Sequence, residues 1–188
     1  MTRSGPLGRC AAVSLLALLG GCEVRVLHPV GATCDTASAI AAVGTWREMG
    51  PTRPDTLRIL RADAGCSLRI LGSSPSDSMR LEVRRTGKRR FYSYRAADDT
   101  VPGFSWGLWH LAADTLEMDS PDLDSFAAWV RRKSLAGTIR TDGGDTSNLD
   151  VLVTEEPAEF ARKLEARRDR ASLFDTSFRM VRIPARER

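Results

Sequence analysis

The sequence is poor in histidine and cysteine, the usual ligands of transition metals. His28 and His110 are its only two imidazoles in 188 residues, and neither has the closely spaced His or Cys partners that a zinc site needs. Two acidic stretches, 119–124 and 142–150, offer oxygen ligands but do not match the spacing of an EF-hand loop. Their residues are also ordinary turn formers. Calcium stays open as an alternative there, and we predict no metal site and no cofactor.

Long apolar runs are also missing after the N-terminus. No run beyond residue 21 approaches the roughly 20 apolar residues that span a bilayer. The first nine residues carry Arg3 and Arg9 without any acidic residue, and an uncharged, largely apolar run follows over 11–21. A basic start followed by an apolar run of roughly 7–15 residues is typical of a secretion signal. We therefore expect residues 1–21 to be removed.

The residues Leu19-Gly20-Gly21-Cys22 close this run and resemble the lipobox of bacterial lipoproteins. The resemblance implies cleavage before Cys22, a thioether-linked diacylglycerol on its sulfur and an acyl chain such as palmitate on its new amine. Several acyl chains anchor a protein stably to a membrane. In Gram-negative families an Asp after the lipidated Cys signals inner-membrane retention, so Glu23 favours the outer membrane, facing the periplasm. An ordinary signal peptide with a chance Cys22 is the alternative.

The mature chain would be small and almost neutral. Removing residues 1–21 leaves 167 residues and removes two arginines, so 26 basic residues face 24 acidic ones, a net charge of +2. This length suits one domain with its own core, and the charge argues against a nucleic-acid binder. We predict a signal peptide over 1–21, a lipidated tether over 22–35 and a single β-rich domain over 36–188.

Two cysteines remain once the N-terminus is processed. Cys10 leaves with the signal and Cys22 takes the lipid, which leaves Cys34 and Cys66 in a compartment that favours oxidation. A pair without other partners predicts one disulfide. Closing a loop of about 30 residues would stabilise the fold by roughly 3–4 kcal/mol. Two buried free thiols are the alternative.

Short apolar–polar alternations follow one another from Val43 onward. Their spacing near 8–12 residues is typical of an all-β sandwich or barrel. We expect a brief helical turn over 37–42, and one amphipathic helix capped by Thr154 whose apolar positions continue to Ala171. A last strand over 178–183 follows that helix. The other expected strands begin at Gly44 and cover 57–59, 68–70, 79–84, 90–94, 104–111, 115–118, 125–131, 137–141 and 149–153.

The tripeptide Gly44-Thr45-Trp46 opens the first of these strands. It resembles the Gly-x-Trp motif of the lipocalin-like family, in which the Trp plugs the closed end of an eight-stranded barrel. The resemblance also implies an Arg stacked over that Trp, for which Arg162 or Arg179 is available, although neither lies in a matching motif. The expected strands outnumber the family's eight. We therefore predict a small antiparallel barrel or sandwich, with the lipocalin-like barrel favoured.

Candidate binding residues are aromatic or basic. Trp46, Trp106 and Trp129 are the candidates for lining a pocket for an apolar ligand. The stretch 80–95 is basic and predicts an edge hairpin, whose charges either stay solvated and prevent edge pairing or contact anionic lipid. Its candidate contacts are Arg84, Arg85, Lys88, Arg89 and Arg90.

One stretch matches a catalytic motif in its sequence but lacks the context that the motif requires. Gly103-Phe104-Ser105-Trp106-Gly107 reads G-x-S-x-G, but that motif needs a strand–turn–helix context and a later histidine. No histidine follows His110, and the residues after Ser105 predict a strand. We therefore expect no catalytic residue and no enzyme activity.

Three hypotheses for function follow from these residues. The first is a non-enzymatic, membrane-anchored barrel that binds an apolar or amphiphilic small ligand. The second is an envelope structural or interaction module with a filled core and no ligand. The third is a hydrolase that uses Ser105. An open cavity facing Trp46 would favour the first, and a barrel packed solid would favour the second.

Overall fold

The computed structural model describes residues 23–50, 54–72, 78–95, 102–141, 149–167 and 170–184. Cys22 and the predicted signal peptide lie outside them, and all the described elements lie between Val24 and Ile183. Within this part no helix is long and apolar enough to cross a membrane.

The strands are β1 Val24–Val26, β2 Thr33–Cys34, β3 Gly44–Glu48, β4 Thr56–Arg61, β5 Ser67–Leu71, β6 Ser78–Thr86, β7 Arg89–Tyr94, β8 Phe104–Ala112, β9 Thr115–Pro121, β10 Gly137–Thr141, β11 Leu149–Val153 and β12 Phe174–Ile183. The helices are α1 Thr36–Ala42, α2 Leu123–Arg131, α3 Pro157–Ala166 and the 3₁₀ turn η2 Arg170–Leu173.

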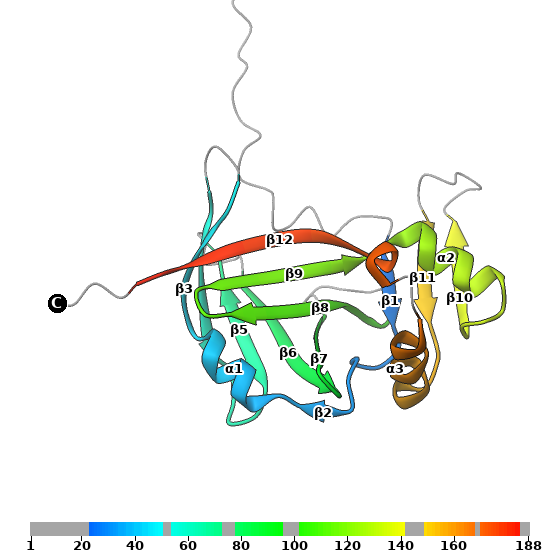
Figure 1. The fold of residues 1–188 in the computed structure, drawn as a ribbon, viewed down its shortest axis with the longest axis horizontal. Coiled ribbons are helices and arrows are strands. Elements are labelled where there is room, and N and C mark those ends of the chain that lie inside the picture. Colours follow the sequence, from blue (N-terminus) through cyan, green and yellow to red (C-terminus); the bar gives the residue numbers. More distant parts are fainter. Residues whose placement is uncertain are drawn as a thin grey trace, which may run out of the picture.

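Eight of the strands close into an antiparallel barrel (Figure 1). Strands β3 to β9 pair in chain order, and β12 then closes the ring by pairing with β9 on one side and β3 on the other. This confirms the prediction of a mainly β protein built on a small barrel.

The barrel has one filled interior because its strands alternate apolar and polar residues. Inward residues come from all eight strands, and each has at most 8% of its surface exposed. Helix α1 lies against this core through Ala39 and Ala42, at the barrel end where β3 begins. The inward set is Trp46, Leu57, Ile59, Leu68, Ile70, Leu81, Val83, Tyr92, Tyr94, Trp109, Leu116, Met118 and Met180.

A second core lies outside the barrel wall. The first half of β8 pairs with β1, which pairs in parallel with β11, and β11 pairs with β10. Helices α2 and α3 gather beside these strands, at the opposite side of the molecule from α1 (Figure 1). Strand β8 therefore serves both cores, because alternate residues point to opposite faces: Trp109 points into the barrel and Trp106 into the second core.

The segment predicted as a tether belongs to the fold. Strand β1 lies within the sheet, β2 pairs with β6, and Val24, Val26 and Val30 are almost fully buried. The tether prediction over 22–35 is therefore wrong for residues 23–35. Its three valines lie two and four residues apart and bury themselves against β8, β11 and β7, a tertiary pairing that no local pattern indicates.

The predicted strand over 125–131 is also wrong, because these residues form most of α2. The Asp122 carboxylate caps this helix by accepting from the Ser125 N–H at 2.8 Å. Leu123, Phe126, Ala127 and Val130 recur at helical spacing, so the residues bury one face of a helix.

The predicted C-terminal helix is present but shorter and differently capped. Helix α3 ends at Ala166, and Ala171 belongs to η2. Its N-cap is Glu156 without a side-chain hydrogen bond, not Thr154, and Pro157 occupies the first turn as expected. The last strand is longer than expected, since β12 starts at Phe174.

Candidate functional site

The predicted anchor, Cys22, directly precedes a tightly held residue. The Glu23 carbonyl accepts a hydrogen bond from the Val151 N–H at 2.9 Å, and the Glu23 N–H donates to the Asp150 carboxylate at 3.3 Å. The Glu23 carboxylate also pairs with Arg25 at 3.0 Å. The folded body therefore starts one residue after Cys22, with no spacer between them.

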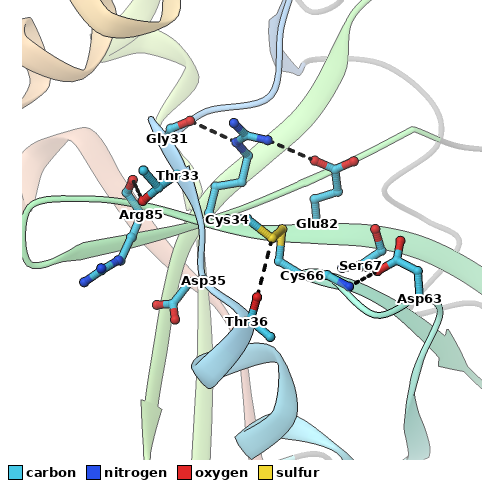
Figure 2. The surroundings of a disulfide bond; sticks show 12 residues. Gly31, Thr33, Cys34, Asp35, Thr36, Asp63, Cys66, Ser67, Glu82 and Arg85 are labelled. Carbon is cyan, nitrogen blue, oxygen red and sulfur yellow. Dashed lines mark hydrogen bonds and ion pairs between the residues drawn. A yellow bond between two sulfur atoms is a disulfide. The ribbon is translucent and has the colours of Figure 1, made fainter.

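The predicted disulfide is present. Cys34 and Cys66 are bonded, with their Cα atoms 5.4 Å apart across 32 positions of sequence. Figure 2 shows the bond joining Cys34 of β2 to Cys66, the residue directly before β5. The Thr36 hydroxyl lies 3.8 Å from the Cys34 sulfur. This disulfide fixes the N-terminal segment onto the outside of the barrel.

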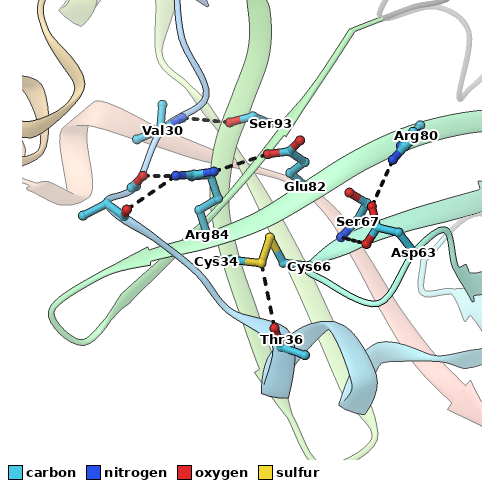
Figure 3. A network of polar contacts seen from close by, with 12 residues as sticks. Val30, Cys34, Thr36, Asp63, Cys66, Ser67, Arg80, Glu82, Arg84 and Ser93 are labelled. Atoms are coloured by element: carbon cyan, nitrogen blue, oxygen red, sulfur yellow. Dashed lines mark hydrogen bonds and ion pairs between the residues drawn. A yellow bond between two sulfur atoms is a disulfide. The ribbon is translucent and has the colours of Figure 1, made fainter.

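Arg84 anchors the same N-terminal segment to β6. Its guanidinium donates to the carbonyls of Gly31, at 2.9 Å, and Ala32, and pairs with Glu82 at 3.5 Å (Figure 3). The Val30 N–H adds a buried hydrogen bond to the Ser93 hydroxyl. Arg84 is therefore a structural residue of this network.

Two further arginines of the basic hairpin also have partners in the fold. Arg90 pairs with Asp35 at 2.9 Å, and Arg89 donates to the Leu164 carbonyl near the end of α3. Arg85 and Lys88 alone among the five candidate lipid contacts have exposed side chains without a partner in the described part of the chain. An anionic-lipid contact by this hairpin therefore depends on these two side chains, and it stays a prediction.

The Arg over Trp46 is Arg182, not Arg162 or Arg179. Its guanidinium carbon lies 4.3 Å from the Trp46 ring centroid, and it donates to the carbonyls of Ala41 and of Val43, the latter at 2.7 Å. Arg182 is the register partner of Trp46 across β12 and β3. Arg179 instead pairs with Glu117 and Arg162 with Glu159, both on the surface. Locating Arg182 requires the register of β12, which sequence patterns do not specify.

Gly44 is needed at this contact. Its φ is +152°, and a Cβ on it would lie 2.6 Å from a terminal nitrogen of Arg182. A side chain here would push the guanidinium away from Trp46, whose indole N–H donates to the Ala42 carbonyl at 2.8 Å. The motif residues and Arg182 together close this end of the barrel beside α1.

The three candidate tryptophans do not share a pocket. Trp46 lies in the barrel core, whereas Trp106 and Trp129 lie in the second core on the far side of β8. The Trp106 ring is enclosed by four phenylalanine rings, with centroids 5.2–6.3 Å away. Trp106 is therefore a packing residue, and the three side chains cannot line one ligand site.

Ser105 lies where the strand prediction places it. It is 4% exposed within β8, and His110 is on the opposite face of that strand, paired with Asp119 at 3.2 Å. The described residues contain no group of three His, Cys, Asp or Glu side chains arranged to hold a metal. Of the two acidic stretches, 142–148 lies outside the described residues, and Asp122 of the other caps α2.

The sequence reasoning missed a row of arginines on the outside of the barrel. Arg47, Arg58 and Arg69 lie on the outer face of β3, β4 and β5 and are exposed. They recur every eleven residues in the sequence, a spacing that could have pointed to them.

Comparison with known proteins adds no relative: no protein-family model, no curated protein and no solved structure matches the chain significantly.

Proposed function

We propose that the chain is an envelope lipoprotein, anchored through acyl chains on Cys22, whose barrel is a filled module that works through its outer surface. The lipobox-like residues 19–22 and the preceding basic and apolar segments support the anchor. The proposed address is the outer membrane, facing the periplasm, because Glu23 is not Asp. The module has no catalytic role in this proposal.

The packed interior is the observation that carries the filled-module function. Trp46, Trp109, Tyr92 and Tyr94 occupy the inside together with branched aliphatic side chains, and Trp46 has no exposed surface. A pocket for a drug-sized ligand needs about 300–1,000 Å³. Side chains with almost no accessible surface leave no water-sized space beside them. The second of our three hypotheses is thus favoured over the ligand-binding one.

A lipocalin-like origin of the barrel is part of the proposal. Three observations support it: eight strands in a closed meander, Gly44-x-Trp46 at the start of the first barrel strand, and Arg182 of the last strand stacked over that Trp. The additional strands β1, β10 and β11 and helix α2 would be elaborations on such a barrel.

Native mass spectrometry of residues 22–188 carrying Cys22→Ala tests the filled interior. All described contacts lie within this span, so the variant keeps both cores. We expect the mass of the bare chain, and no binding of indole by calorimetry. Trp109→Ala is the matched control, because an engineered apolar cavity takes up small apolar molecules; Leu57→Ala replaces it if that variant fails to fold. A co-purified apolar ligand in the parent chain would favour the ligand-binding function instead.

A further inference from the structure

Three neighbouring strands of the barrel each present an arginine to solvent. Arg47 faces outward from β3, Arg58 from β4 and Arg69 from β5. In each strand the buried residues next to the arginine point into the barrel. Arg47 is level with Thr56, two residues from Arg58, and Arg69 is level with Leu60, again two residues from Arg58. Diagonal neighbours on a sheet are about 7–8 Å apart. We call these three residues the arginine face.

The arginine face has no counter-charge among the described residues. None of its three side chains has a hydrogen bond or an ion pair there. Two nearby acidic groups are engaged elsewhere, since Asp63 pairs with Arg80 and Glu82 with Arg84. In the described part of the chain no ion pair joins Glu48 or Asp55 to the arginine face. Several other outward arginines are paired within the fold, including Arg90 with Asp35 and Arg179 with Glu117.

The face also concentrates like charge. Arg69 stands directly opposite Arg80 of β6 on the same side of the sheet. Like charges in directly opposed positions destabilise a sheet. Asp63 offsets the charge of Arg80, so the positive charge left unpaired on this side is that of the arginine face, and an external anion would offset it.

The spacing selects an array of anions over a single small one. The outside of a barrel is convex and β4 separates Arg47 from Arg69, so the three guanidinium groups do not all converge on one phosphate. Each fork can instead hold its own phosphate in a bidentate manner. Half-buried Leu60 and Leu71, the register partners of Arg69 and Arg58, lie between the charges. The face carries no aromatic side chain for base stacking, which disfavours single-stranded nucleic acid.

We propose that the arginine face binds the phosphate-bearing surface of an anionic lipid layer. Lipid headgroups present many phosphates in one plane, and the leucines suit the boundary between headgroups and solvent. The proposal rests on the proposed envelope function only for the source of the lipid. It moves the lipid contact from the basic hairpin, where three of five candidates hold the fold together, to β3, β4 and β5.

Vesicle co-sedimentation of residues 22–188 carrying Cys22→Ala tests this binding without any acyl anchor. The probe is a phosphatidylcholine vesicle containing phosphatidylglycerol, with pure phosphatidylcholine vesicles beside it. We expect binding only to the anionic vesicle, weakening as NaCl is raised. Inorganic phosphate should compete no better than NaCl of equal ionic strength, because a single phosphate cannot engage the whole face.

Two triple variants with equal loss of charge locate the contact. Each basic residue near an anionic surface contributes roughly fivefold in affinity, so Arg47→Gln/Arg58→Gln/Arg69→Gln should bind on the order of a hundredfold more weakly. The control, Arg131→Gln/Arg132→Gln/Arg140→Gln, removes three exposed charges from α2, the residue after it and β10, and should bind within a fewfold of the parent. Equal losses in both variants, strong competition by free phosphate, or no binding to anionic vesicles would overturn the proposal. Because Cys22 is absent here, failure of the anchor prediction would leave this result untouched.

Discussion

At the scale of single side chains, Arg182 joins the last strand of the barrel to its first. Its guanidinium stacks on Trp46 and donates to two carbonyls at the C-terminal end of α1, where carbonyls lack helical partners. A cation at that end also complements the helix dipole. We expect Arg182→Ala to lower the free energy of unfolding by about 2–4 kcal/mol, from the lost stacking and charged hydrogen bonds. Urea denaturation of the mature chain measures this.

Arg182→Lys is the matched control for that prediction. Lysine keeps the charge but lacks the planar fork that reaches two carbonyls while stacking on a ring. Its loss should therefore fall between the parent and the Ala variant. Equal stability of the Lys variant and the parent would mean that charge alone, and not the stacked geometry, holds this end.

Asp35 is a second single residue with a testable contribution. Burial acts to raise its pKa, but the Ser38 N–H and hydroxyl and then Arg90 outweigh burial, so the pKa lies below its ordinary range. A carboxyl with a lowered folded pKa stabilises above its unfolded pKa of about 3.9 and loses that stabilisation as pH falls through the folded value. We expect Asp35→Asn to cost about 1–2 kcal/mol at pH 7 and almost nothing well below pH 3. Unfolding curves across pH measure the difference in free energy of unfolding between the parent and the Asn variant. A difference that does not change with pH would contradict a stabilising charge on Asp35.

At the scale of elements, α2 depends on its N-cap. The Asp122 carboxylate accepts the Ser125 N–H, and the helix then presents Phe126 and Trp129 to the second core. Asp122→Ala should lower the free energy of unfolding by about 1 kcal/mol. Asp124→Ala is the control, because Asp124 is exposed in the first turn and interacts only with the helix dipole. Thermal unfolding of both variants should rank Asp122→Ala as the less stable one, and the reverse order would refute the cap.

The barrel strands were predictable because each alternates apolar and polar residues locally. Leu57-Arg58-Ile59 and Leu68-Arg69-Ile70 lie in β4 and β5 as expected, and the disulfide followed from counting cysteines. Helix α2 is so short that the helical spacing of its apolar residues is hard to distinguish from the pattern of a strand. The closure of the ring by β12 depends on long-range pairing, which no local pattern encodes. For the same reason Arg182 and the arginine face needed the register before they became visible.

At the scale of the whole molecule, β8 couples the two cores. Trp106 and Trp109 point to opposite sides of one strand, so neither core can open without disturbing the shared wall. We expect Trp106→Ala to cost about 3–5 kcal/mol. We also expect one unfolding transition, reported alike by near-ultraviolet circular dichroism and by calorimetry. Two separated transitions would show that the second core melts alone and that the coupling is absent.

The attachment of the whole molecule to a membrane depends on one sulfur atom. The lipobox-like residues Leu19-Gly20-Gly21 precede Cys22, so Cys22→Ala should abolish metabolic labelling with palmitate and remove the acyl chains that anchor the protein. Cys10→Ala is the matched control: Cys10 lies in the predicted signal, so labelling should persist. Because Glu23 is already hydrogen-bonded to β11, the acyl chains would join the folded body without a spacer. Continued labelling of Cys22→Ala would refute the anchor, and loss of labelling in Cys10→Ala would place the modification elsewhere.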